Sequence, residues 1–310
     1  MDTRKDLTII QTTHNGDSRT QEHISTNGVI QLRRLAKDST SGPYISIDIY
    51  TSDPSLDVTT SWDSKLRTLM LSTPRSAVVK LPGPHCISVE IIAYLPENAE
   101  LQTLILNSIT LSQNVHEDLK IAAEYSKFKT ASGAVRFPEF KEPSVVAPTT
   151  DELSNQTLPS FVKPDHIFAC RHVEVETESG SISGLFPLYD YLGIKSTSGS
   201  VTVGAMPHDK DPERPAPAEL TISTVSGKIS AHLPIIAAEG HRYLPPLREY
   251  NIHVTSTSGA ITGSFYQGLH AYFETVSGRI EGSLLPVIGQ SSGNTLSTHS
   301  QSGRQTIDIM

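Results

Sequence analysis

An eight-residue pattern that recurs along the second half of the chain constrains the fold more than any other feature. FKTASGAV at 128–135 returns as VETESGSI (175–182), IKSTSGSV (194–201), ISTVSGKI (222–229), VTSTSGAI (254–261) and FETVSGRI (273–280), with a weaker copy, THSQSGRQ, at 298–305. The glycines of these copies are 47, 19, 28, 32, 19 and 25 residues apart. The shortest interval therefore defines the bare unit, and the longer intervals contain insertions.

Within each copy one parity carries an apolar residue and then hydroxyl residues, while the other parity carries polar or charged residues that read as solvent-facing, and this period of two predicts a strand. After the glycine the strand resumes with an isoleucine or valine, which we expect to point into a core. A glycine at one fixed place would allow a backbone bend with positive φ, which a side chain would resist. Each unit therefore predicts a strand, a sharp bend, a second strand and a return loop. The bend glycines of the clear copies are Gly133, Gly180, Gly199, Gly227, Gly259 and Gly278.

Two topologies fit this unit: a β-hairpin with Ser-Gly at its turn, or one coil of a parallel β-solenoid with Ser-Gly at a corner. Two-residue hairpin turns favour Asn-Gly or Asp-Gly, so six Ser-Gly turns would be a poor choice. Stacked coils also explain why each column repeats one residue type. We therefore predict an all-β, right-handed parallel β-solenoid with coils of about 19 residues and a strand-rich N-terminal cap.

The chain divides into three predicted regions: a disordered N-terminus at 1–22, β-rich coils or a cap at 23–127, and the Ser-Gly solenoid at 128–310. The second strand of several copies ends in an apolar residue followed by proline, which stops a strand. Long inserts follow these prolines at 138–165, 207–219 and 234–250. We therefore expect the inserts to leave from one edge of the solenoid, either as a binding face or as tolerated surface loops.

Composition and motifs exclude several function classes. The net charge is −8 and there is no run of basic residues, so we expect no nucleic-acid partner. No phosphate-binding, dinucleotide-binding, zinc-protease or nucleophile-elbow motif occurs, and we expect no cofactor. There is also no apolar segment long enough for a signal peptide or a transmembrane helix, so the expected location is intracellular unless the N-terminus is incomplete.

The nearest approach to a metal site is His166, Cys170 and His172, which share one parity of a strand-like segment. A metal site usually needs further ligands from elsewhere in the chain, so ordinary polar side chains explain this set better and we predict no metal. Cys86 and Cys170 are too few for a disulfide framework, although one bridge between them stays open.

The inserts and the short return after 185 hold aromatic and charged residues that the repeat faces lack. Aromatic rings with a few polar groups are typical of a sugar or peptide site, whereas a flat Ser/Thr sheet offers little depth. The candidate ligand-binding residues are Tyr189, Tyr191, His208, Arg242, Tyr243, Arg248 and Tyr250.

The Thr-x-Ser-Gly-x-Ile unit resembles the adhesin-type β-solenoid family, which occurs in bacteria and fungi. The resemblance covers about 128–310 well and 44–127 weakly. It implies a β-solenoid fold and supplies no catalytic residues. We therefore expect a non-catalytic structural or binding module, with a glycan or a protein as its partner at the insert-bearing edge. The alternatives are a carbohydrate-active β-helix enzyme of the polysaccharide lyase or hydrolase type, and an intracellular scaffold.

Overall fold

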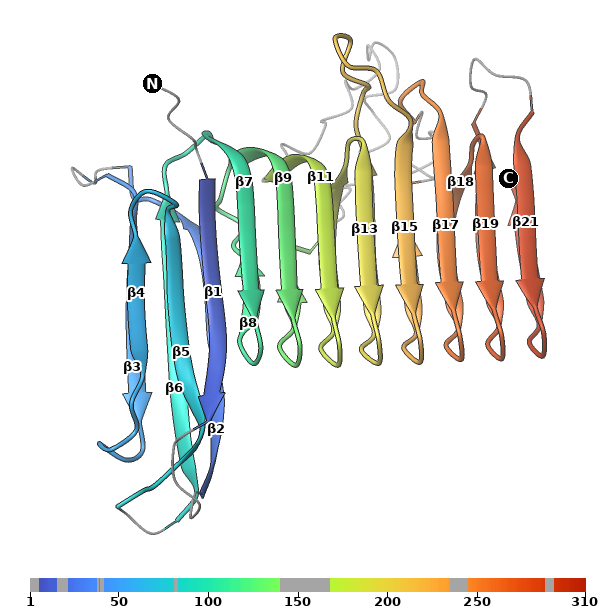
Figure 1. The fold of residues 1–310 in the computed structure, drawn as a ribbon. Helices are drawn as coiled ribbons and strands as arrows, with labels where there is room; N and C mark the ends of the chain where they lie inside the picture. The colour runs from blue at the N-terminus through green and yellow to red at the C-terminus, as the bar shows by residue number, and fades with distance from the viewer. Residues whose placement is uncertain are drawn as a thin grey trace, which may run out of the picture.

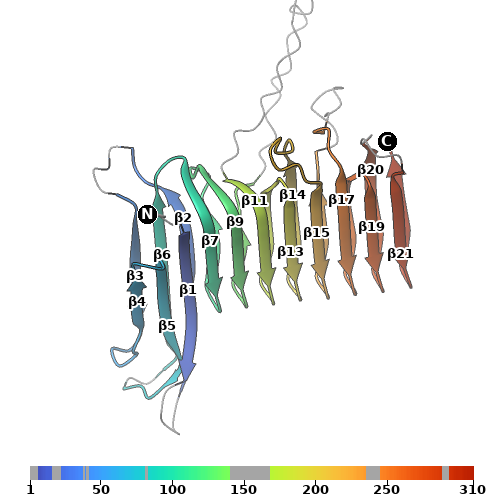
Figure 2. The same ribbon diagram turned by 45° about the horizontal axis from the view of Figure 1, so that its top comes forward.

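The computed structural model describes residues 6–15, 22–37, 39, 42–80, 83–139, 168–234, 245–287 and 293–310, and these residues form 22 β-strands and no helix. The strands form two long sheets that face each other (Figures 1 and 2). Most neighbouring strands are parallel; the antiparallel pairs are β2–β5, β3–β6 and β4–β5. The structure is therefore all-β and solenoid-like, as the repeats predicted.

The front sheet of Figure 1 runs, from its N-terminal edge, through β4 (Thr59–Asp63), β5 (Thr68–Ala77), β1 (Asp6–Asn15), β7 (Ala99–Ser108), β9 (Ile121–Thr130), β11 (Phe168–Thr177), β13 (Tyr191–Ser196), β15 (Ala218–Thr224), β17 (Tyr250–Ser256), β19 (His270–Thr275) and β21 (Thr295–Ser300). The back sheet runs through β3 (Tyr44–Thr51), β6 (His85–Leu95), β2 (Glu22–Arg34), β8 (Ser112–Val115), β10 (Val135–Arg136), β12 (Ile182–Leu188), β14 (Val201–Pro207), β16 (Ile229–His232), β18 (Ile261–Gln267), β20 (Ile280–Pro286) and β22 (Gln305–Ile309).

Each Ser-Gly copy contributes one strand to the front sheet and the next to the back sheet. Equivalent residues of successive copies stand side by side: Thr177 pairs with Ser196, and Ser196 pairs with Thr224. The parallel register excludes the hairpin alternative, because hairpin strands would pair antiparallel within one copy.

The core lies between the two sheets, where the isoleucines and valines that follow the glycine meet the apolar side chains of the front strands. Ile182, Val201, Ile229 and Ile261 are fully buried. Aromatic rings fill the interior near the middle of the molecule, where Phe128 and Phe137 meet edge to face at 5.0 Å.

The repeat glycines are required for a different reason from the one predicted. None of them has a positive φ; among the described residues the glycines that do are Gly28, Gly83, Gly184, Gly263 and Gly293. Instead, the corners stack so closely that a Cβ at Gly180 would lie 1.7 Å from the carbonyl oxygen of Gly133, and one at Gly199 would lie 1.9 Å from that of Gly180. The prediction of a left-handed bend is wrong, and the glycine column exists because successive corners touch through their backbones.

The hydroxyl three residues before each glycine closes the corner from inside. The Gly227 amide donates to Thr224 Oγ1 at 3.0 Å, and the Gly259 amide donates to Ser256 Oγ at 2.8 Å. These hydroxyl residues are buried, so the bond satisfies a corner amide that water does not reach.

The predicted N-terminal region differs from the structure. Residues 6–15 form β1, which pairs with β5 and β7, so the prediction of disorder over 1–22 is wrong for this segment. The predicted boundary at 127 falls inside β9, and β7, β9 and β11 pair continuously across it. Of these strands β7 lacks the Ser-Gly mark, which explains why the sequence pattern missed its continuity with β9 and β11. No helix of the described residues is long and apolar enough to cross a membrane.

Candidate functional site

The Ser-Gly corners lie at one end of the strands, and the 207–217 connection between β14 and β15 lies at the other (Figure 1). Much of the other two predicted inserts, over 140–167 and 235–244, lies outside the described residues, and so do Arg242 and Tyr243. The described residues near the 207–217 connection form the candidate site.

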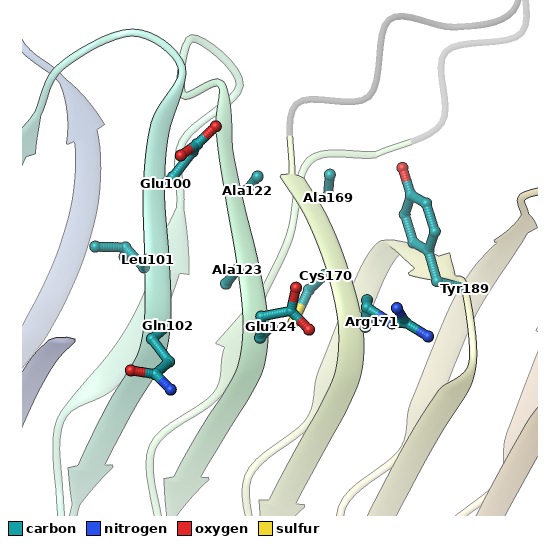
Figure 3. A pocket seen from close by; sticks show the side chains of 10 residues that line it. All are labelled: Glu100, Leu101, Gln102, Ala122, Ala123, Glu124, Ala169, Cys170, Arg171 and Tyr189. Atoms are coloured by element: carbon teal, nitrogen blue, oxygen red, sulfur yellow. The ribbon is translucent and has the colours of Figure 1, made fainter. Parts of the chain in front are cut away.

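A hollow of about 590 Å³ lies over the upper ends of β7, β9 and β11, close to this connection (Figure 3). Ala122 and Ala169 are neighbours in register on β9 and β11, and neither is buried. Their small side chains leave room between the larger groups around them. Those groups are Glu100, Gln102, Glu124, Arg171 and Tyr189.

Tyr189 is the aromatic residue that lines the hollow. Its half-buried ring stacks on the imidazole of His208, with ring centroids 3.8 Å apart and planes 10° from parallel. His208 itself is buried. Burial raises the pKa of the Tyr189 hydroxyl, so this group stays protonated and can donate a hydrogen bond at neutral pH. The stack fixes the ring in one orientation at the edge of the hollow.

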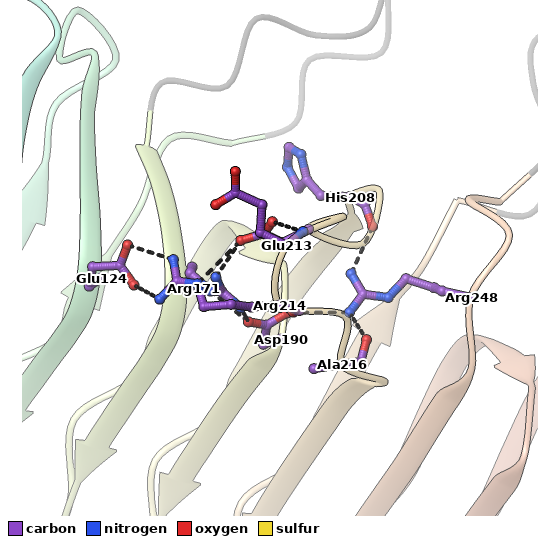
Figure 4. A network of polar contacts seen from close by, with 9 residues as sticks. Glu124, Arg171, Asp190, His208, Glu213, Arg214, Ala216 and Arg248 are labelled. Carbon is purple, nitrogen blue, oxygen red and sulfur yellow. Dashed lines mark hydrogen bonds and ion pairs between the residues drawn. The ribbon is translucent and has the colours of Figure 1, made fainter.

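An ion-pair network holds the 207–217 connection against the outer side of the front sheet (Figure 4). Arg171 Nε donates to Asp190 Oδ2 at 2.7 Å, and its Nη1 donates to Asp211 Oδ2 at 2.6 Å. Arg214 forms a two-point contact with Glu124, at 3.2 Å and 3.4 Å. A hydrogen bond from the Glu213 amide is the largest contribution that lowers the pKa of Asp211, which therefore stays ionised. The network joins residues of three coils to one loop.

Arg248 supports the same loop from inside. Its side chain is only 1% exposed, and it donates to the carbonyl oxygens of His208 at 2.9 Å and Ala216 at 2.6 Å, as well as to Asp190 at 3.4 Å. Arg248 thus fixes both ends of the loop and, through His208, the ring of Tyr189.

The predicted ligand-binding residues therefore fall into different roles. Tyr189 lines the hollow, whereas His208 and Arg248 are buried and lie beside it, under the 207–217 connection (Figure 4). Tyr250 is fully buried and donates to the Pro246 carbonyl, so it belongs to the core. Tyr191 lies lower on the front sheet, stacked on His172 at 4.4 Å. Four polar residues of the hollow were missed. Glu100 and Gln102 stand on β7, which has no Ser-Gly motif, and Glu124 and Arg171 precede the motif on β9 and β11. The paired outward alanines are a signal that marks the place.

The His166, Cys170 and His172 set does not form a metal site in the part of the chain that is described. His166 lies outside it, Cys170 is buried, and the His172 side chain is 40% exposed. Along β11 the alternation of buried and more exposed residues shifts by one position between Cys170 and Val173. Cys170 and His172, which share a parity in sequence, therefore differ in burial. Cys86 and Cys170 are both free thiols, so the open question of a bridge between them is answered.

Farther down the front sheet, a second polar cluster joins Lys127 on β9 to Glu174 and Glu176 on β11. Lys127 Nζ contacts Glu174 at 2.8 Å and Glu176 at 3.0 Å. Burial alone would raise the pKa of both carboxyls, but the hydrogen bonds and charge of Lys127, together with His172 at Glu174 and Lys129 at Glu176, outweigh it and both pKa values are lowered. Hydrogen bonding to Glu174 raises the pKa of Lys127. The cluster is thus a fully ionised ladder that ties neighbouring coils together.

Comparison with protein-family models, with curated proteins and with solved structures finds no match to this chain. The geometry of the hollow is therefore the feature of this molecule that bears on its function.

Proposed function

We propose that this protein is a non-catalytic β-solenoid binding module, related to the adhesin-type solenoids, that binds a saccharide in the hollow over β7, β9 and β11. We also propose that the solenoid is right-handed and that its shortest coil has 19 residues. That length is supported by the pairing of His172 with Tyr191 and of Val254 with Phe273, each 19 residues apart.

The single observation that carries the proposal is the Tyr189 ring, held by His208 at the edge of the hollow. Pyranose rings have an apolar face that packs on aromatic rings, and their hydroxyls bond to carboxylate, amide and guanidinium groups. The hollow supplies both kinds of contact: Tyr189 for the face, and Glu100, Gln102 and Arg171 for the hydroxyls. A small number of placed polar groups beside an aromatic wall is the usual composition of a small-ligand site.

The contact that Glu124 makes with Arg214 supports binding without catalysis. A glycosidase needs one carboxylic acid that remains protonated, with a raised pKa. Glu124, which lines the hollow, is held in a two-point contact by Arg214, which suits a positioned hydrogen-bond acceptor better than a proton donor.

The test is a glycan array followed by isothermal titration of the best hit. We expect binding by the wild-type protein, a loss of at least tenfold in affinity for Tyr189→Ala, and near-normal affinity for the matched control Tyr272→Ala, which removes a front-sheet tyrosine that does not line the hollow. A depolymerisation assay with the same glycan should give no product. Binding that survives Tyr189→Ala, or release of shorter sugars, would overturn the proposal.

A further inference from the structure

Strand β3 forms the N-terminal edge of the back sheet, and among the described residues it pairs on one side only, with β6 (Figure 1). The Ser52 amide donates to the Cys86 carbonyl at the end of this antiparallel pair. Because hydrogen-bonded positions alternate along an antiparallel pair, the even-numbered residues of β3 direct their backbone groups to β6. The amides and carbonyls of Ile45, Ile47 and Ile49 therefore point to the unpaired edge.

The sequence of this strand is nearly symmetric. Residues 44–50 read Tyr-Ile-Ser-Ile-Asp-Ile-Tyr, which has almost the same order in both directions about Ile47. An antiparallel copy of the strand, related by a twofold axis at Ile47, would place Ile45 opposite Ile49 and Ser46 opposite Asp48. The residues with outward-pointing backbone groups would then face one another, and each such pair would exchange two hydrogen bonds.

The side chains agree with the same register. Ile45, Ile47 and Ile49 pair with inward residues of β6 and are packed only partly against the core, so the end of the core beside them is open. On β4, at the same end, Trp62 lies opposite the buried Leu69 and is 51% exposed. A second copy would cover these apolar groups.

The edge also lacks the features by which proteins block strand pairing. Natural edge strands carry prolines, lysines or bulges. Strand β3 has none of these in eight residues, and its pairing with β6 is regular throughout. Its one charge, Asp48, would meet the hydroxyl of Ser46 in the partner and not a like charge.

The opposite end of the solenoid also carries apolar side chains. Leu296 and Ile307 of the last coil pack partly against the core, and Ile309 is 62% exposed, while Thr298 Oγ1 donates to Gln305 Oε1 across the two sheets at 2.7 Å. Neither β21 nor β22 reads nearly the same in both directions, as β3 does. The symmetry of β3 therefore points to the N-terminal end as the one that pairs with a second copy.

We infer that two copies of this chain form a twofold dimer by antiparallel pairing of β3 with β3, centred on Ile47. Such an interface is isologous, because the same strand serves on both sides. It adds main-chain hydrogen bonds as strand addition does, and its register is specified by the isoleucines on one face and the Ser46–Asp48 pairs on the other. The inference is independent of the proposed saccharide site.

The experiment is sedimentation-velocity ultracentrifugation of the full chain over a concentration series, with three variants. Ser46→Asp places a carboxylate opposite Asp48 of the partner twice in each dimer, and we expect it to raise the dimer dissociation constant by roughly 2- to 30-fold. The double variant Ser46→Asp, Asp48→Ser exchanges the two side chains and restores the pairing, so its dissociation constant should return to that of the wild type. Thr202→Asp adds the same charge at an exposed position of β14 and should change nothing.

A second measurement uses the wild-type protein alone. Hydrogen exchange at the amides of Ile45, Ile47 and Ile49 should slow as the protein concentration rises, while exchange at Tyr44 and Asp48, whose amides bond to β6, should not depend on concentration. A wild-type chain that is monomeric at every concentration would overturn the inference. So would a dimer that is insensitive to Ser46→Asp, or one that the exchanged variant fails to restore while its far-ultraviolet circular dichroism is normal.

Discussion

Replacing one corner glycine by alanine tests the backbone contact that stacks the coils. At Gly227 an added Cβ would lie 2.0 Å from the carbonyl oxygen of Gly199 and 2.8 Å from its carbonyl carbon. Ordinary contact begins at 3.4 Å, so one corner must move by about 1.4 Å relative to the other. A movement of that size breaks the bonds from the Gly227 amide to Thr224 and from the Ser226 amide to Thr197, which are both 3.0 Å long.

The expected cost follows from these changes. Overpacking costs about 1–3 kcal/mol and each lost hydrogen bond about 0.5–1.5 kcal/mol, whereas alanine returns about 0.4–1 kcal/mol by restricting the unfolded chain. The net loss of stability for Gly227→Ala is therefore about 3 kcal/mol. Gly42→Ala is the matched control, because nothing lies within 4 Å of its added Cβ and its φ is not positive. We expect that variant to be unchanged or slightly stabilised.

The assay is urea unfolding followed by far-ultraviolet circular dichroism, with hydrogen exchange at Val225 and Ser226 to detect local opening of the corner. Repeat proteins can unfold in parts, so the exchange data are needed beside the unfolding midpoint. If Gly227→Ala had the same midpoint and the same exchange rates as Gly42→Ala, the close approach of the corners would not be the reason for the glycine column.

Three further changes probe the core, the loop and the ionised ladder. Ile229→Asp places an unpaired carboxylate at a fully buried position, and thermal melting should show loss of the cooperative transition; a normal melt would contradict the inward assignment. Arg248→Met leaves two loop carbonyls without their donor, so limited proteolysis should cut within 208–216 faster while the β-type circular dichroism remains; an unchanged cleavage rate would show that the arginine does not hold the loop. Because the pKa values of Glu174 and Glu176 are lowered in the folded state, their stabilisation is present above the unfolded value of about 4.3 and is lost as the pH falls through the folded values. In Lys127→Met the unfolding midpoint should fall less steeply with decreasing pH than it does in the wild type. An equally steep fall would refute the assignment.

The stacking of the coils could be predicted from sequence because each stacked column repeats one residue type. The buried position of Ile229 and the pairing of Ser196 with Thr224 both follow from aligning the Ser-Gly copies. The reason for the glycines could not be predicted in the same way. A positive φ and a close backbone contact both select glycine, and only the position of the neighbouring corner distinguishes them.

The candidate site was predicted only in part, since burial depends on how a loop folds back over the sheet. Tyr189 was identified from its place near the inserts, but Arg248 and Tyr250 have similar sequence surroundings and prove to be buried. Glu100 and Gln102 stand on β7, which carries no repeat mark, and their proximity to Tyr189 arises only when three coils stack.

Methyl NMR of protein labelled at alanine tests the central claim, that the hollow binds a saccharide, most directly. Ala122 and Ala169 line the hollow, whereas Ala205 and Ala231 are buried in the core. Titration with the best glycan from the array should shift the Ala122 and Ala169 methyl signals in a saturable manner, leave those of Ala205 and Ala231 in place, and have no effect in Tyr189→Ala. Saturable binding that leaves Ala122 and Ala169 unmoved would contradict the assignment of the site.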